Sequence, residues 1–138
     1  MTAAEEIYVR QARCQPHLLR LRTLAARTGT ADGQVPAEIR QAVSAVLAEV
    51  TAAARIWPGM AAAAPANPDA PFLGVRLARL TAAAEDAVAA AQEGNTAAAR
   101  CHVQRFETLT SAVWTVQQVL HGAAPSLLAR ASVAALAI

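Results

Sequence analysis

The chain has 138 residues, 55% of them hydrophobic but only 4% aromatic, and a formal net charge of +2. This length suits one domain with a single hydrophobic core, and so small a net charge does not define a class of partner. No stretch of about 18 apolar residues is present, which argues against a membrane span. The opening MTAAEEIYVR has two acids and no long apolar run, so we expect no export signal and a cytoplasmic protein.

The composition predicts an all-α protein, because alanine, the best helix former, is the most frequent residue, whereas there are only 6 glycines and 7 prolines. A first helix is predicted over residues 2–28. Thr2 and Glu5 have the spacing of a capping box at its start, and the sequence GTADG ends it. Pro16 lies inside this helix, so we expect a kink or a short break near residues 12–15.

Three further helices are predicted over residues 36–57, 70–93 and 96–121. Pro36 stands at a favoured first helical position, and a Pro-Gly pair follows the second helix. Gly94 ends the third helix, and the fourth begins only one or two residues later. So short a turn requires the third and fourth helices to form an antiparallel hairpin.

Apolar residues keep helical spacing along all four segments, which are similar in length. These features predict a single domain over residues 1–122, an antiparallel four-helix bundle with a kinked first helix. The linker 58–69 is rich in proline and alanine, and it can close the bundle within one chain or pass a hairpin to a second chain. The apolar segment 123–138 can form a short fifth helix for docking or association.

An arginine-rich strip, residues 10–27, contains five arginines and no acid. On a helix, one side of this strip forms a ridge made of Arg10, Arg13, His17, Arg20 and Arg27. This ridge has three interpretations: it is a solvated or salt-bridged face, it binds a protein partner, or it binds nucleic acid. Residues 1–31 and 95–138 are basic (+3 and +2), whereas 32–68 and 69–94 are acidic (−1 and −2). This complementarity favours salt bridges, and the absence of interleaved aromatic residues makes nucleic acid the weakest interpretation.

Two clusters contain residues that can carry chemistry. Cys14 and His17 share one side of the first helix, a spacing that metal ligands use, but no Cys-x-x-Cys pair accompanies them. Cys14 is also in line with leucines, where a thiol acts as a small hydrophobic group. We therefore predict no metal and no cofactor. A second set lies on the fourth helix and is a candidate lining for an internal pocket: Cys101, His102, Arg105 and Glu107.

Trp114 lies about 120° from the centre of the apolar stripe on the fourth helix, beside polar residues. An amphipathic ring at such a border often marks an interface or the mouth of a pocket. The C-terminal segment also needs a surface to cover. The candidate interface residues are Trp114, Leu127, Leu128, Val133, Leu136 and Ile138.

The leading hypothesis is a non-enzymatic interaction protein that self-associates by helix packing, with a homodimer favoured and a different protein partner as a further option. One alternative is a small-molecule-binding bundle, or a small all-α biosynthetic enzyme, with an internal apolar pocket. A second alternative is a regulator that contacts nucleic acid or an acidic partner through the arginine ridge. No sequence motif decides among the three.

Overall fold

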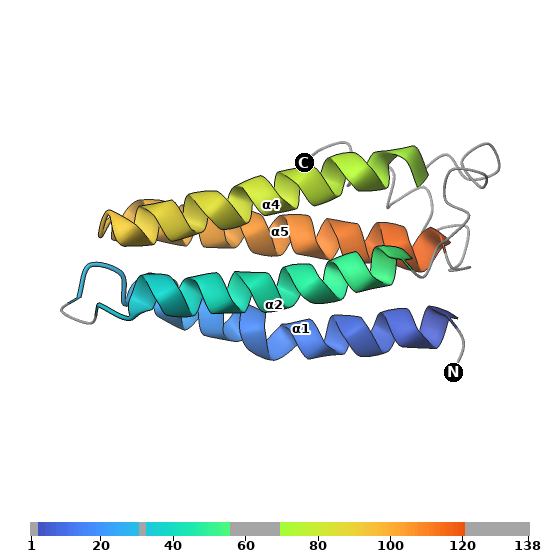
Figure 1. Cartoon of the computed structure of the whole chain (residues 1–138), viewed down its shortest axis with the longest axis horizontal. Coiled ribbons are helices and arrows are strands. Elements are labelled where there is room, and N and C mark those ends of the chain that lie inside the picture. Colours follow the sequence, from blue (N-terminus) through green and yellow to red (C-terminus); the bar gives the residue numbers. More distant parts are fainter. Residues whose placement is uncertain (1–2, 31–32, 56–69, 121–138) are drawn as a thin grey trace.

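The computed structural model describes residues 3–30, 33–55 and 70–120, which form four α-helices (Figure 1). The predicted all-α four-helix bundle is confirmed, and the helix ends agree with the predicted ones to within two residues. The linker 58–69 and the segment 123–138, with its predicted fifth helix, lie outside the described residues. The helices are α1 Ala3–Ala26, α2 Val35–Arg55, α4 Ala70–Gln92 and α5 Thr96–Leu120.

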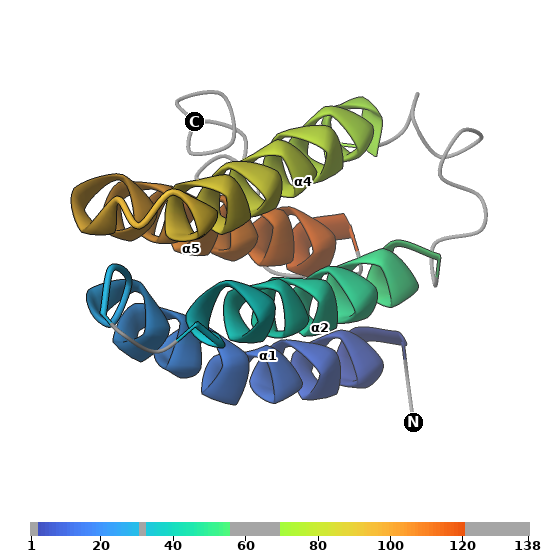
Figure 2. The ribbon, with the colours of Figure 1, turned by 60° about the vertical axis from the view of Figure 1, so that its left-hand side comes forward.

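The four helices stand at the corners of a bundle in the order α1, α2, α4, α5 (Figures 1 and 2). Each helix runs antiparallel to its two neighbours in this order. The pair α4 and α5 has the most extensive contact, whereas α2 meets α5 only narrowly across a diagonal. On the other diagonal, α1 and α4 lie at opposite corners, so their outer faces point away from each other.

Helix α1 is continuous from Ala3 to Ala26, with Pro16 inside it. Of the two expected alternatives near residues 12–15, the short break does not occur, whereas the ribbon changes direction between the two ends of the helix, as the expected kink requires (Figure 2). A proline removes one backbone hydrogen bond and crowds the preceding turn, which bends a helix without necessarily ending it. Pro16 itself is exposed, so the bend does not disturb the core.

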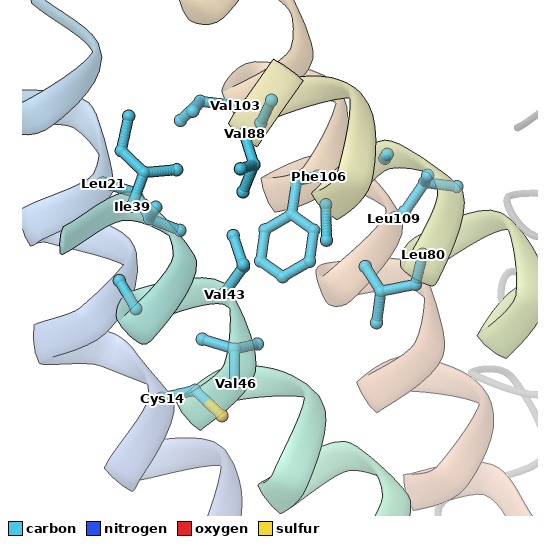
Figure 3. Close-up of a cluster of buried hydrophobic side chains, with 14 of the residues drawn as sticks. Cys14, Leu21, Ile39, Val43, Val46, Leu80, Val88, Val103, Phe106 and Leu109 are labelled. Atoms are coloured by element: carbon cyan, nitrogen blue, oxygen red, sulfur yellow. The ribbon is translucent and has the colours of Figure 1, made fainter. Parts of the chain in front are cut away.

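One hydrophobic core fills the space between the helices, because each helix contributes a stripe of buried apolar residues. Phe106 is fully buried at the middle of this cluster, with Val43 from α2 and Val88 and Leu80 from α4 drawn around it (Figure 3). Burying a side chain of this size contributes about 1.5–3 kcal/mol relative to its exposed state. Many core positions are alanine, which allows the helices to approach closely.

The turn between α4 and α5 is a Schellman motif followed directly by a helix cap. The N–H of Asn95 donates to the carbonyl of Ala90, and the N–H of Gly94 donates to that of Ala91. Gly94 has a φ of 70°, a left-handed conformation that glycine adopts without strain. Asn95 also caps α5, because its side-chain oxygen accepts a hydrogen bond from the N–H of Ala98 at 3.0 Å.

The two hairpin turns contact each other at one end of the bundle. The hydroxyl of Thr96, in the first turn of α5, donates to the carbonyl of Thr28 at the end of α1. Gly29 follows with a φ of 83°, and a Cβ at this position would lie 3.0 Å from the carbonyl oxygen of Gly94. The absence of a side chain at Gly29 therefore allows this close approach, which holds the two hairpins together.

Candidate interaction surface

The outer side of α1 presents large apolar side chains to solvent. Tyr8 is 55% exposed, Leu19 59% and Val9 37%. They lie opposite the buried stripe of the same helix, and Ala12 and Pro16 fill the space between them, also exposed. We name these five residues the α1 apolar face. No charged side chain interrupts it, and Tyr8, Ala12 and Leu19 recur at intervals of four and seven, a spacing typical of helix packing seams.

The arginine ridge borders this face, and most of its charge is paired with α2. Arg10 contacts Glu6 at 2.9 Å and Glu49 at 3.1 Å, and the two carboxylates raise the pKa of its guanidinium. Arg20 contacts Glu38 at 3.3 Å. These contacts support the salt-bridged interpretation of the ridge. Each such surface pair contributes about 0–1 kcal/mol, so the ridge aligns α1 with α2 more than it stabilises the fold.

Arg13 and His17 complete the ridge in different surroundings. The guanidinium of Arg13 lies 4.0 Å from the carboxylate of Glu49, and its side chain is 59% exposed. His17 is half-buried beside Leu18. Arg27 is exposed near the end of the helix, where its backbone N–H donates to the carbonyl of Leu24. Of the three ridge arginines that pair with α2, Arg13 has the most exposed side chain and the longest contact, and it lies next to the α1 apolar face.

The four residues predicted to line a pocket do not come together. Glu107 instead binds Arg22 of α1, whose Nε lies 2.8 Å and 3.0 Å from its two carboxylate oxygens. Glu107 lines a shallow groove of about 360 Å³ between α1 and α5. Cys101 and Arg105 are exposed, and His102 is half-buried, away from that groove. At about 100° per residue, Cys101, His102 and Arg105 share one side of α5 and Glu107 lies on another, so the four residues do not line one groove as predicted.

Trp114 lies in the core, only 2% exposed, and not at the surface where its helical-wheel position placed it. The reason is that α5 contacts three other helices, so its buried side is wider than one apolar stripe. An interface role through an exposed Trp114 ring is therefore corrected. The other candidate interface residues, Leu127, Leu128, Val133, Leu136 and Ile138, lie outside the described residues.

Cys14 is fully buried, as its alignment with leucines predicted. Burial, together with the negative charge of Glu49, raises the pKa of its thiol to about 12, although the nearby indole N–H of Trp114 acts in the opposite direction. A thiol with such a pKa is neutral and unreactive at physiological pH. Within the described ranges, no three His, Cys, Asp or Glu side chains are grouped so that they could hold a metal ion.

Buried polar side chains form a feature that the sequence analysis missed. Gln117 is 1% exposed, and its amide donates to the carbonyl of Val50 at 3.4 Å while its Oε1 has no partner among the described residues. Arg76 is 2% exposed, and burial and the charge of Arg79 lower its pKa. A sequence signal did exist for Arg76, since it lies four residues before the buried Leu80.

A groove of about 340 Å³ runs between α2 and α4 on another side of the bundle. Val43, Leu47 and Val88 give it an apolar floor, and Arg40 and Glu85 stand among its polar lining residues. This groove is open to solvent, so it differs from the internal pocket that one sequence hypothesis required. It also contains none of the four residues predicted for that pocket.

Comparisons of the chain with protein families, curated proteins and solved structures find no match. Within residues 3–30, 33–55 and 70–120, no helix has both the length and the apolar character needed to cross a membrane.

Proposed function

We propose that this chain is a non-enzymatic helical-bundle protein that associates with copies of itself through exposed helix faces. The observation that carries the proposal is the α1 apolar face, where Tyr8 and Leu19 are both more than half exposed. Removing such side chains from water is favourable by about 25 cal/mol per Å² of apolar area. A stripe of this kind, bordered by charged residues, is characteristic of surfaces that bind another protein.

The surroundings of the reactive side chains support a binding role over a catalytic one. The thiol of Cys14 is buried and neutral, and Glu107 is engaged by Arg22. Catalytic groups need convergent geometry and pKa values near the working pH. We place the protein in the cytoplasm, where a reducing environment keeps its two free cysteines as thiols.

Native mass spectrometry of the untagged protein tests the proposal over a range of concentrations. We expect masses that are whole multiples of 14.3 kDa and that increase with concentration. A single-chain mass at every concentration would overturn self-association. Additional mass that is lost on denaturation would instead indicate a retained small molecule, and would favour the groove between α2 and α4 as the functional site.

A C-terminal deletion separates two sources of association. The segment 123–138 contains the five candidate interface residues outside the described structure, and a variant ending at residue 122 removes them all. If the helix faces drive association, this variant keeps the wild-type subunit count. If it becomes a single chain, the C-terminal segment is the interface, as one sequence hypothesis predicted.

A further inference from the structure

The outer side of α4 carries a second exposed apolar stripe, which consists mainly of small side chains, whereas the α1 apolar face has large ones. Val75 is 48% exposed, and three exposed alanines, Ala78, Ala82 and Ala89, continue the stripe at intervals of three, four and seven. We name these four residues the α4 small-residue face. Among the described side chains, the large apolar ones exposed to solvent are therefore confined to two outer faces, one on α1 and one on α4.

The charges beside the two faces have opposite signs. The α4 small-residue face is bordered by three exposed acids, Glu85, Asp86 and Glu93. Between Val75 and Glu93, the one exposed basic residue is Arg79. Arginines border the α1 apolar face, and Arg13 has the most accessible guanidinium of the paired ridge residues. Complementary charges of this kind orient an approaching partner and select its register.

The two faces also match in shape and length. Tyr8 and Leu19 are bulky and are separated by 11 residues, which corresponds to about 16 Å of helix. The stripe from Val75 to Ala89 spans 14 residues, about 21 Å, and its three alanines have short side chains. Large side chains on one helix fit between small residues on another, and this arrangement lets two helices pack closely.

Two copies of the α1 apolar face do not complement each other in the same way. In an antiparallel two-fold arrangement, the same flank of each helix meets its copy, so the flank that carries the exposed Arg13 would face the same flank of the other copy. Like charges at a contact are unfavourable. The acidic surroundings of α4 avoid this repulsion and make α4 the better partner for α1.

Resting on the proposed self-association, we infer that the α1 apolar face of one copy docks on the α4 small-residue face of the next. Because α1 and α4 occupy opposite corners of the bundle, each copy binds one neighbour on each side (Figure 2). Such a head-to-tail contact forms a ring if its rotation closes and an open chain if it does not. The assembly is therefore not limited to the two-fold dimer that the sequence favoured.

Two single substitutions, each disabling one face, test this arrangement. Leu19→Glu places a carboxylate in the α1 apolar face, and Ala82→Arg places a bulky cation in the α4 small-residue face. Both positions are exposed, so the bundle should fold, which helical circular dichroism and urea unfolding verify. The matched controls are Ser111→Glu on α5 and Ala48→Arg on α2, which make the same charge changes at exposed positions on other helices.

Each disabled variant should be a single chain at concentrations where the wild type and both controls assemble. An equimolar mixture of the two variants should form pairs and nothing larger, because each chain keeps one working face and the two working faces are complementary. Variants that retain the wild-type subunit count, or that fail to pair when mixed, overturn the head-to-tail contact but leave self-association standing. A wild-type protein that is itself a single chain overturns both.

Discussion

At the residue scale, Gly29 is the described glycine at which backbone conformation and close neighbours leave the least room for a side chain. Its φ is 83°, and an added Cβ would approach the carbonyl oxygen of Gly94 to 3.0 Å. Gly29→Ala should lower the free energy of unfolding by about 1–3 kcal/mol, through strain and loss of contact between the turns. Urea unfolding monitored by circular dichroism measures this change.

Gly33 provides the matched control, because it lies in the same α1–α2 connection with nothing within 4 Å of an added Cβ. Gly33→Ala should leave stability unchanged or raise it by up to about 1 kcal/mol, since alanine restricts the unfolded chain. If the two substitutions have the same effect, the contact between the hairpin turns does not stabilise the bundle.

The buried thiol of Cys14 predicts a specific loss of stability at alkaline pH. Its pKa is raised from 9.0 to about 12 in the folded chain. Between these values the unfolded chain loses the thiol proton while the folded chain keeps it, so this contribution to stability falls as pH rises, by up to about 1.4 kcal/mol per pH unit. Well below pH 9 both states hold the proton, and the dependence disappears.

Urea unfolding of the wild type and of Cys14→Ala at several values between pH 8 and about 11 measures this loss. The wild type should lose stability more steeply than the variant, and the difference between their slopes isolates Cys14. Equal slopes would contradict the burial of a neutral thiol. A thiol reagent offers an independent readout, because exposed Cys101 should react in the folded protein and Cys14 only after unfolding.

At the scale of the helix, α1 keeps its helical path despite Pro16. Proline in a helix interior typically costs about 3 kcal/mol, so Pro16→Ala should raise the free energy of unfolding by about 1–3 kcal/mol. The exposed position of Pro16 means that the substitution creates no cavity. Lower stability in this variant, measured by urea unfolding, would show instead that the bend is required to pack both halves of α1.

The helices were predictable because their ends depend on local sequence. Gly94 terminates α4, Pro36 lies in the first turn of α2, and Asn95 caps α5 through its own side chain. These signals act within one or two turns of the chain, where propensity and capping decide the outcome. Local signals left two outcomes open at Pro16, a kink or a short break, and the helix stays continuous because packing along the rest of α1 outweighs a local cost.

The environment of single side chains was less predictable, because it depends on how many helices meet at each position. Trp114 is buried since α5 contacts three helices, and no window of α5 contains that information. The pairing of Arg22 with Glu107 joins residues 85 positions apart. The burial of Trp114 and the separation of Glu107 from the other predicted pocket residues depend on which helices pack side by side, and the sequence alone does not give that arrangement.

At the scale of the whole molecule, the residues that hold the bundle together are distinct from those of the two exposed apolar faces. Its core and the contact between Thr96 and Thr28 hold the two hairpins together. The outer faces of α1 and α4 take no part in that core, and they carry the exposed Tyr8, Leu19 and Val75. Substitutions on these faces are therefore expected to leave the fold intact, so that a change in the proposed association can be measured on a folded chain.

Salt should distinguish the head-to-tail contact from a purely apolar one. The charges proposed to meet, Arg13 on one copy and Glu85 and Asp86 on the next, are exposed, so ions screen them effectively. The screening length falls from about 10 Å at 0.1 M salt to about 3 Å at 1 M. Raising the salt concentration over this range should weaken association several-fold, as measured by sedimentation equilibrium, and should leave the unfolding midpoint nearly unchanged. Association that strengthens with salt would point to apolar burial without charge pairing, as expected for the segment 123–138.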